Sequence, residues 1–231
     1  MNSLDTPRVA TLLTRLHAAA EASDRAHLEK MMAQLNAPDT SIEQMMAHYM
    51  AEERRDYPAV YRGYADNFLA ISPAFGRFLY ALVRATGARR IVEFGSSMGI
   101  STLYLAAAVR DNGGGIVIGS ELEPGKVAKA RAHLAEAGLD DLVDIREGDA
   151  LDTLADMGGA IDLALIDGAL SLYLPVLKLI EPALRTGAAV IGENAFAPDY
   201  QAYVHDPANG YVSQPVQIGE ARGNEFSVRI A

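Results

Sequence analysis

The sequence has no cysteine among its 231 residues, and its basic residues are few. Without cysteine, disulfide bonds and thiolate metal sites are excluded. The 20 Lys and Arg residues stand against 30 Asp and Glu residues, which gives a formal net charge of −10. Because an acidic surface repels phosphate backbones, we expect no nucleic-acid partner.

Long apolar runs are also missing. No stretch reaches the length of a membrane span, and the N-terminus has an early Asp5 and no apolar run of signal-peptide length. We therefore expect a cytoplasmic protein with no membrane partner. The hydrophobic fraction of 50% is enough for a full core, and the length predicts one domain with an appendage.

Residues 1–71 are predicted to form a helical arm of three amphipathic helices. Thr6 caps the first helix, Ser23 begins the second, and a capping box of Thr40 and Glu43 opens the third. The three apolar stripes are Val9, Leu12, Leu13 and Leu16; Leu28, Met31, Met32 and Leu35; and Ile42, Met45, Met46 and Met50. Because these stripes require burial, the arm can pack on the core, on a second subunit, or over a ligand as a lid. We favour the first two, and we predict a homodimer.

Residues 72–231 are predicted to form a unit in which strands and helices alternate. After a capped helix at 72–87, the expected strands are 90–95, 115–122, 142–149, 161–167 and 188–194, and the expected helices are 100–110, 124–138, 150–157 and 172–185. This alternation predicts a parallel sheet covered on both faces, and the tail at 210–231 predicts an antiparallel hairpin at its edge. The predicted fold class is α/β, a Rossmann-like doubly wound sheet of seven strands with an N-terminal helical arm.

The turn after the first strand, Gly-Ser-Ser-Met-Gly at 95–99, indicates which nucleotide the sheet can bind. A dinucleotide fingerprint needs G-x-G-x-x-G, whose middle glycine lets the backbone approach a pyrophosphate. Only Gly95 and Gly99 are present, and the anionic Glu93 precedes them. A carboxylate repels a phosphate but attracts an ammonium or sulfonium group. S-Adenosylmethionine, which carries both cations and no phosphate, therefore fits this turn.

Acidic residues also follow the next two strands. Glu121 ends the second strand, where a carboxylate can accept hydrogen bonds from both ribose hydroxyls. Asp149 and Ala150 follow the third strand, where a side-chain acceptor and a backbone amide can meet the adenine edge. Because an acid after a strand also commonly caps the next helix, capping and adenine contact are weighted equally for Asp149.

The motifs VEFGSSMGIS, SELEP, EGDA, ALIDGALSLYLPVL and VIGENAF occur in an order that resembles the catechol-type O-methyltransferases, a class I family that uses S-adenosylmethionine. The resemblance is strongest from Ser72 to the C-terminus and looks closest to bacterial members that act on small molecules. The site residues that it implies are Glu93, Gly95, Ser97, Gly99 and Ser101 around the methionine moiety, Glu121 at the ribose, Asp149 and Ala150 at the adenine, and Asp167 facing the sulfonium and the acceptor.

The chain departs twice from the metal site of that family. In the family pattern the fourth strand ends in Asp-x-x-Lys and the fifth in Asp-Asn, so that two aspartates and the asparagine bind magnesium while the lysine takes or stabilises a catechol proton. Here Leu170 stands at the lysine position, and Glu193 stands before Asn194 in place of the second aspartate. Leucine cannot accept a proton, and the longer glutamate moves its carboxylate by more than a bond length.

Two interpretations of this departure remain. In one, Asp167, Glu193 and Asn194 still bind a divalent metal such as magnesium, and another group serves as the base. In the other, which we favour, no metal is bound and the acceptor is a non-catechol nucleophile, such as an indole carbon or an amine. Asp167 or Glu193 then takes the product proton or stabilises positive charge. Neutral drift at Leu170, compensated by a nearby tyrosine, is a third possibility.

Several residues outside these motifs are further candidates. Three tyrosines before the core suit the wall of an acceptor pocket, although packing on a partner subunit is weighted slightly higher: Tyr57, Tyr61 and Tyr64. Three residues after the fifth strand are expected to line the mouth of the site, the last as a catalytic proton carrier: Tyr200, Tyr203 and His205. The remaining histidines have no partners at ligand spacing and are expected at the surface or in packing: His17, His27, His48 and His133.

Two rival functions stand beside methyl transfer to a small aromatic acceptor. An NAD-dependent dehydrogenase lacks its glycine fingerprint in this chain. A binding or scaffold protein that kept the cofactor pocket but lost its catalysts would bind cofactor without turning over any acceptor.

Overall fold

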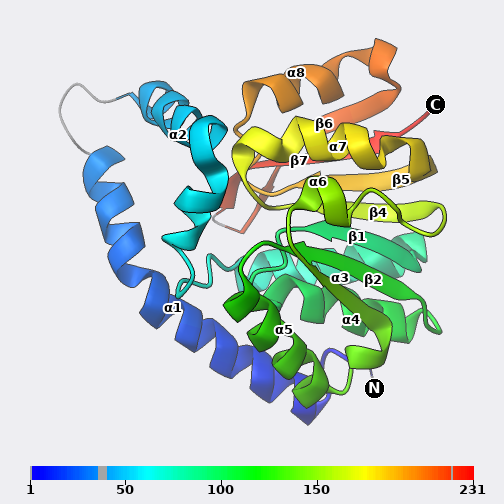
Figure 1. Cartoon of the computed structure of the whole chain (residues 1–231). Helices are drawn as coiled ribbons and strands as arrows, with labels where there is room; N and C mark the ends of the chain where they lie inside the picture. Colours follow the sequence, from blue (N-terminus) through cyan, green and yellow to red (C-terminus); the bar gives the residue numbers. More distant parts are fainter. Residues whose placement is uncertain (1, 36–40, 220) are drawn as a thin grey trace.

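A seven-stranded sheet forms the centre of the computed structural model, which describes residues 2–35, 41–219 and 221–231 (Figure 1). The strands lie in the order β3-β2-β1-β4-β5-β7-β6. Their bounds are Arg90–Phe94 (β1), Ile116–Glu121 (β2), Val143–Glu147 (β3), Ile161–Ile166 (β4), Leu184–Gly192 (β5), Tyr211–Ile218 (β6) and Ala221–Arg229 (β7). The predicted Rossmann-like sheet of seven strands is confirmed.

The strand directions determine where a ligand site can form. β1 to β5 pair in parallel, whereas β7 runs antiparallel to both β5 and β6, as predicted for the hairpin at the edge. Phe94 at the end of β1 pairs with Ser120 of β2 on one side and with Ile166 of β4 on the other. The strand order reverses between β1 and β4, and the carboxyl ends of parallel strands at such a point leave a crevice for a ligand.

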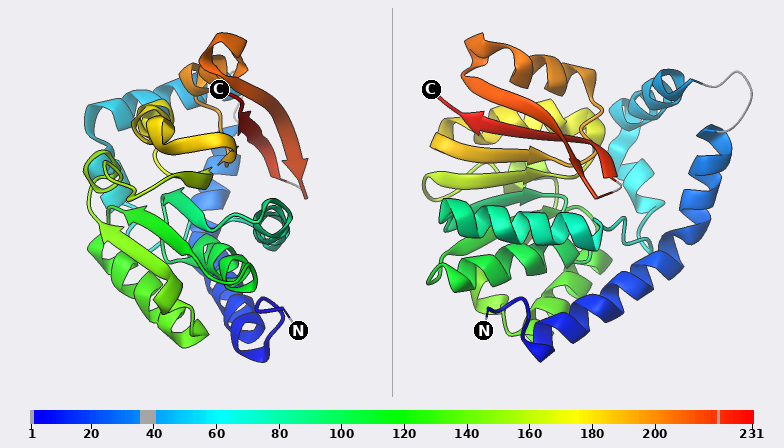
Figure 2. Two further views of the ribbon diagram at one scale, coloured as in Figure 1. Left: turned by 90° about the vertical axis from the view of Figure 1, so that its right-hand side faces the viewer. Right: turned by 180° about the vertical axis from the view of Figure 1, so that it is seen from behind.

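Helices cover both faces of the sheet (Figure 2). Ile91 and Val92 of β1 belong to different apolar layers because neighbouring side chains in a strand point to opposite faces. The layer with Ile91 contains α3 (Pro73–Thr86), α4 (Ile100–Asp111) and α5 (Pro124–Ala137), and the layer with Val92 contains α6 (Ala150–Thr153), α7 (Tyr173–Ile180) and α8 (Pro198–His205). Short 3-10 helices are η1 (Asp140–Leu142), η2 (Leu170–Leu172), η3 (Glu181–Ala183) and η4 (Pro207–Asn209).

Two predicted helix lengths are wrong. The helix expected at 150–157 ends at Thr153, and the residues after it bring Leu154 and Met157 into the core. The helix expected at 172–185 ends as α7 at Ile180, and β5 begins at Leu184, four residues before its predicted start. The second error concerns an apolar segment, in which periodicity alone does not separate helix from strand.

The first part of the arm is one helix, α1 (Pro7–Leu35), and not two. The prediction that Ser23 begins a second helix is wrong, since its hydroxyl donates to the Ala20 carbonyl oxygen at 3.2 Å within an unbroken helix. A serine in mid-helix can satisfy its hydroxyl in this way, so serine alone is a weak start signal.

The apolar stripe of α1 packs on α4 and α5 of the same chain. Its buried members are Val9, Leu12, Leu13, Leu16 and Ala20. Packing of the arm on the core is therefore confirmed, while the homodimer stays a prediction. The side chains of Met31, Met32 and Leu35 lie outside the described residues. None of the described helices combines the length and the hydropathy needed to cross a lipid bilayer.

The second helix of the arm, α2 (Ile42–Arg62), has a different cap from the predicted one and a kink. Ser41 and Gln44 form the capping box, whereas Thr40 lies outside the described residues. Asp56 has non-helical dihedral angles, and Pro58 follows it. Because proline supplies no backbone N–H and crowds the preceding turn, a kink at this point is expected.

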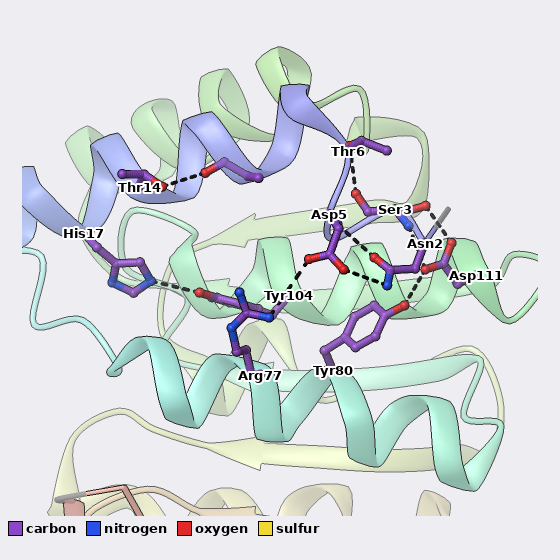
Figure 3. Close-up of polar contacts among 11 residues, drawn as sticks. Asn2, Ser3, Asp5, Thr6, Thr14, His17, Arg77, Tyr80, Tyr104 and Asp111 are labelled. Atoms are coloured by element: carbon purple, nitrogen blue, oxygen red, sulfur yellow. Dashed lines mark hydrogen bonds and ion pairs between the residues drawn. The ribbon is translucent and has the colours of Figure 1, made fainter.

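Polar contacts fix the start of the chain to the core (Figure 3). The Asp111 carboxylate, at the end of α4, accepts hydrogen bonds from the Ser3 backbone N–H at 2.9 Å, the Ser3 hydroxyl at 2.6 Å and the Tyr80 hydroxyl at 2.6 Å. Burial acts to raise the pKa of Asp111, but these hydrogen bonds outweigh it and the pKa is lowered. The ionised carboxylate therefore joins the N-terminus to α3 and α4.

Candidate active site

A cavity of about 940 Å³ lies at the carboxyl ends of the five parallel strands. Each strand places at least one predicted site residue in its lining. These residues are Gly95 after β1, Glu121 at the end of β2, Asp149 after β3, Asp167 after β4 and Glu193 after β5. The sheet therefore brings together side chains that are nearly 100 residues apart in the sequence, at the position expected for a ligand of this architecture.

The turn after β1 requires its first glycine. Gly95 has φ of +92°, and a Cβ atom there would lie 2.1 Å from the Asp167 carbonyl oxygen. Gly99 has φ of +88° and caps α4, but it faces Ala130 and is not among the residues that line the cavity. The two glycines thus bring the turn close to β4 and α5, and of the two only Gly95 reaches the ligand space.

The Glu121 carboxylate is held in place by backbone groups. It accepts hydrogen bonds from the backbone N–H of Ser97 and of Glu123, both at 2.8 Å. Burial raises the pKa of Glu121, while these bonds and the nearby Lys126 ammonium act in the opposite direction. Because its position is fixed before any ligand binds, Glu121 presents an oriented acceptor to the cavity.

Asp149 performs the capping role and also lines the cavity. Its carboxylate accepts a hydrogen bond from the Leu151 backbone N–H at 2.9 Å at the start of α6, and another from the Tyr57 hydroxyl of α2. Burial and then this contact raise the pKa of Tyr57 to about 12. Ala150, the other residue predicted at the adenine, lines the same part of the cavity.

Glu93 lies behind the glycine turn and not in the lining of the cavity, contrary to the prediction that it stands beside the ligand. It is fully buried, and its Oε2 accepts hydrogen bonds from the hydroxyls of Ser96 at 2.7 Å and Thr102 at 2.5 Å. Burial raises the pKa of Glu93 despite these bonds. In this position the Glu93 carboxyl group holds the turn against α4 through its hydrogen bonds with Ser96 and Thr102.

A smaller pocket adjoins the glycine turn. Gly95, Ser97, Ser101 and Asp167 line it, together with the linker at 68–71. The Ser97 hydroxyl donates to the Phe68 carbonyl oxygen at 2.6 Å, which joins the turn to the linker. All the residues predicted around the methionine moiety lie at this end of the site except Glu93 and Gly99, which support it from behind.

Two carboxyl groups, the buried Glu193 and the partly exposed Asp167, lie side by side in the cavity. Burial, followed by the charge of Glu193, raises the pKa of Asp167 well above its usual value. Burial raises the pKa of Glu193 to about 7, although hydrogen bonds with Asp167 and Asn194 act in the opposite direction. Two adjacent carboxyl groups in a low dielectric cannot both ionise easily, so this pair favours holding a proton or a cation.

The residue at the lysine position of the family pattern is apolar and buried. Leu170 is 8% exposed and lines the cavity together with Asp167, Glu193 and Asn194. These three are oxygen donors of the kind that hard divalent cations prefer, so their chemistry fits such an ion. Within the described residues, no group of three or more His, Cys, Asp and Glu side chains is arranged for a metal.

Helix α2 forms an aromatic wall over the cavity. Its lining residues include Met45, Met46, Tyr49, Tyr57 and Tyr61, followed by Tyr64. The tyrosines predicted as possible pocket walls therefore do line the pocket. His27 and His48 also line it, a position that their sequence spacing did not indicate.

Tyr200, Tyr203 and His205 are not among the lining residues, so the prediction that they line the mouth of the site is wrong. Tyr200 is fully buried and packs edge-on against Tyr173, with ring centroids 5.6 Å apart. His205 Nε2 lies 3.0 Å from the carboxylate of Glu225 on β7. The sequence placed these residues by chain order, whereas α8 turns Tyr200 toward α7 and His205 toward the hairpin.

The structure also assigns contacts to acidic residues that the sequence analysis passed over. Asp24 of α1 is 6% exposed, and its carboxylate accepts hydrogen bonds from the backbone N–H of Phe68 and of Leu69, both at 2.8 Å. Glu53 of α2 is fully buried beside Tyr61. An acid within a polar stretch of a predicted helix carries no signal of burial, because most such acids are solvated.

Comparison with known proteins adds to this geometry. Residues 92–195 match the protein-family model described as "Methyltransferase domain". The chain is 35% identical over 127 residues to the catechol O-methyltransferase of Mycobacterium tuberculosis, covering 54% of this chain and 57% of that protein. It is 31% identical over 130 residues to the catechol O-methyltransferase of Niastella koreensis, covering 54% and 58%. The match thus spans somewhat more than half the length of these relatives.

Solved structures share the fold over most of the chain. An O-methyltransferase from Bacillus cereus, solved in complex with SAH, superposes with a TM-score of 0.63 at 22% identity, over 86% of this chain and 96% of that one. At this level of identity the likeness shows a common fold.

Proposed function

We propose that the protein transfers a methyl group from S-adenosylmethionine to a small acceptor bound under α2. The match of residues 92–195 to a methyltransferase-domain model and the similarity of about half of the chain to catechol O-methyltransferases support this proposal. The observation that carries this proposal is the position of Glu121, Asp149 and Asp167, at three strand ends around one cavity. The B. cereus structure, which shares the fold, holds SAH.

In this proposal, the carboxylates and the glycine turn each bind a different part of the cofactor. Glu121 accepts hydrogen bonds from the ribose hydroxyls, and Asp149 with Ala150 meets the adenine. Gly95, Ser97 and Ser101 surround the methionine end, and Asp167 faces the sulfonium. When bound, S-adenosylmethionine supplies a methyl group already activated as an electrophile, so the protein must align it with the acceptor and remove one proton.

The acceptor in this proposal is a small aromatic molecule. The tyrosines and methionines of α2, together with Phe196 across the cavity, offer flat apolar surfaces with a few polar tips. Such surfaces suit a planar ligand, since aromatic groups pack well by stacking and edge contacts.

The finer proposal is a metal-independent reaction on a non-catechol nucleophile, such as an indole carbon or an amine. It is supported by the apolar Leu170 and by the Asp167–Glu193 pair, which can satisfy its charge with a shared proton. The alternative is metal-dependent methylation of a catechol-like hydroxyl. That alternative is supported by the oxygen donors Asp167, Glu193 and Asn194 and by the names of the curated relatives.

One experiment tests these proposals together. Purified protein is incubated with S-adenosylmethionine and catechol, phenol, indole or aniline, with and without exhaustive chelation, and products are detected by mass spectrometry as one added methyl group. We expect methylation that survives chelation. Activity that chelation abolishes and magnesium restores would establish the metal-dependent alternative. Binding of S-adenosylhomocysteine without turnover of any acceptor would favour a scaffold, and a melting shift with NADH alone would favour a dehydrogenase.

A further inference from the structure

The cavity is backed by a carboxylate that the proposed function leaves without a role. Glu53 of α2 is 0% exposed. Its Oε1 accepts a hydrogen bond from the Tyr61 hydroxyl at 3.0 Å, and its Oε2 accepts one from the Ser171 backbone N–H at 2.7 Å. Among the described residues, no Lys, Arg or His side chain pairs with it. A buried carboxyl group without a cation is costly, so its retention calls for an explanation.

The kink in α2 sets the contact between Glu53 and Tyr61. In a straight helix, residues eight apart are separated by about 12 Å along the axis. The non-helical Asp56 and the following Pro58 break the helix between them, and the Asp56 carboxylate caps the second part by accepting from the Ala59 N–H at 3.0 Å. The Tyr61 hydroxyl is thereby brought to the carboxylate of Glu53.

Glu53 and Tyr61 also contact the loop at 168–171, which has Leu170 at the position of lysine in the family pattern. The Tyr61 hydroxyl lies 3.3 Å from the Gly168 carbonyl oxygen, next to Asp167, and Glu53 binds the N–H of Ser171, next to Leu170. Tyr61 lines the cavity, whereas Glu53 is not among the lining residues. Tyr61 therefore stands between the acceptor space and a proton acceptor behind it, beside the position where the family has its base.

We propose that Tyr61 and Glu53 form a proton relay that replaces the missing lysine. This inference rests on the proposed function, because every acceptor considered there loses one proton on methylation. The acceptor atom forms a bond to the methyl carbon as the carbon–sulfur bond breaks and its electron pair returns to sulfur. The acceptor proton passes to the Tyr61 oxygen as the Tyr61 proton passes to Glu53 Oε1. After product release, the reverse transfer through Tyr61 returns the proton to solvent in the open cavity.

A relay through Tyr61 fits its environment better than direct deprotonation by tyrosine. Burial, followed by the charges of Tyr49 and Glu53, raises the pKa of Tyr61 well above 10. The phenol thus stays protonated, and it can take a second proton only if it gives its own away. The neighbouring Tyr49 and Tyr173 also have raised pKa values through burial and stay protonated. Of the two acceptors within hydrogen-bonding distance of the Tyr61 hydroxyl, only the Glu53 carboxylate is a base, because the Gly168 carbonyl oxygen is an amide oxygen.

The test compares wild-type protein with Glu53→Gln, Tyr61→Phe and the double variant, using whichever of catechol, phenol, indole and aniline the wild type methylates fastest. Each single variant is expected to lower kcat at least 100-fold, within the range of general acid–base catalysis. The KM of the acceptor and the Kd of S-adenosylhomocysteine are expected to change less than threefold. The double variant should be no slower than either single one, because both interrupt one path. The fall in wild-type kcat on transfer to D2O should disappear in both single variants.

A matched Tyr–Glu pair remote from the cavity provides the control. The Tyr203 hydroxyl donates to Glu181 at 3.0 Å, and neither residue lines the cavity. Tyr203→Phe and Glu181→Gln should leave kcat within about threefold of wild type. If Glu53→Gln does not fold, shown by loss of S-adenosylhomocysteine binding, Tyr61→Phe decides by itself.

Several outcomes would overturn the relay. A kcat equal to that of the wild type in Tyr61→Phe would overturn the relay. A double variant whose loss of kcat is the product of the two single losses would also overturn it. Either result would leave the proposed methyl transfer intact. A wild-type protein that binds no S-adenosylmethionine and methylates none of the four acceptors would overturn the proposed function, and the relay with it.

Discussion

At the residue scale, the site contains four carboxyl groups with raised pKa values. Glu93, Glu121 and Glu193 are buried and Asp167 is partly exposed, and desolvation raises the pKa of each. Strongly perturbed acids around one cavity are typical of functional sites, where their cost is offset by a ligand or a reaction. Their placement at strand ends could be predicted, because the carboxyl ends of parallel strands meet at one edge.

Glu121 is expected to carry much of the affinity for the cofactor. We predict that Glu121→Ala weakens binding of S-adenosylhomocysteine roughly tenfold or more, since hydrogen bonds to a charged group contribute about 1.5–3 kcal/mol each. Isothermal titration calorimetry measures the change. Glu147→Ala is the control, because Glu147 holds the matching register position on β3 but is exposed and lies outside the cavity. Equal affinity in the Glu121 variant and the control would exclude the ribose role.

The buried pair also predicts a pH dependence of stability. A carboxyl group whose pKa is higher in the folded than in the unfolded protein stabilises the fold at low pH, and this contribution is lost as the pH rises. For Glu193 the window runs from 4.5 to about 7. Between pH 4.5 and about pH 7, the free energy of unfolding of the wild type should therefore fall relative to that of Glu193→Gln. Urea denaturation at several pH values measures it, and a difference that stays constant or grows would contradict the assignment.

Some residues of the site could not be found from the sequence. Glu53 and Tyr61 meet only because α2 is kinked between them, and helical spacing alone places them two turns apart. His205 was predicted from chain order, and its distance from the cavity depends on how α8 packs beneath the hairpin. Contacts set by a kink or by tertiary packing have no local signature in the sequence.

At the scale of secondary structure, the sheet was easier to predict than the arm. Short strand segments flanked by glycine and alternating with helices leave few alternatives, and each of the five parallel strands overlaps an expected strand. In the arm, Ser23 looked like a helix start but lies within α1, because hydroxyl-bearing residues are compatible with both positions. The undivided α1 is what carries Asp24 to the linker.

Helix α1 is expected to influence cofactor binding through Asp24. Removal of its carboxylate frees the N–H groups of Phe68 and Leu69, and the linker that lines the smaller pocket loses its anchor. We predict that Asp24→Ala weakens S-adenosylhomocysteine binding about tenfold. The exposed Asp66, two residues before the linker, provides the control in Asp66→Ala. The same titration serves both variants, and an unchanged Kd for Asp24→Ala would show that the linker holds its shape without α1.

At the scale of the whole molecule, stability depends on how the N-terminus closes onto the core. Asp111 accepts three hydrogen bonds, two from Ser3 and one from Tyr80 (Figure 3). We predict that Asp111→Ala lowers the free energy of unfolding by about 1–3 kcal/mol. Asp5→Ala should change it by less than about 0.5 kcal/mol, because its ion pair with Arg77 is exposed and 4.0 Å long. Comparable losses in the two variants, measured by urea denaturation, would argue against the anchoring role.

Oligomeric state also belongs to this scale. The stripe of α1 that suggested a homodimer is buried within its own chain. Static light scattering measures the mass in solution, and a monomer would end that prediction.

Helix α2 contacts both the proposed adenine end of the cavity and the loop beside the proposed acceptor pocket. Tyr57 bonds to Asp149 at the proposed adenine end, while Glu53 and Tyr61 bond to the loop at 168–171. We expect the cofactor to exchange only when α2 moves, and α2 also forms the wall of the proposed acceptor pocket. We therefore expect a compulsory order of addition, with the sulfonium compound entering first and its demethylated form leaving last. Product-inhibition patterns would reveal the order of addition. Random addition would mean that the two parts of α2 on either side of its kink move independently.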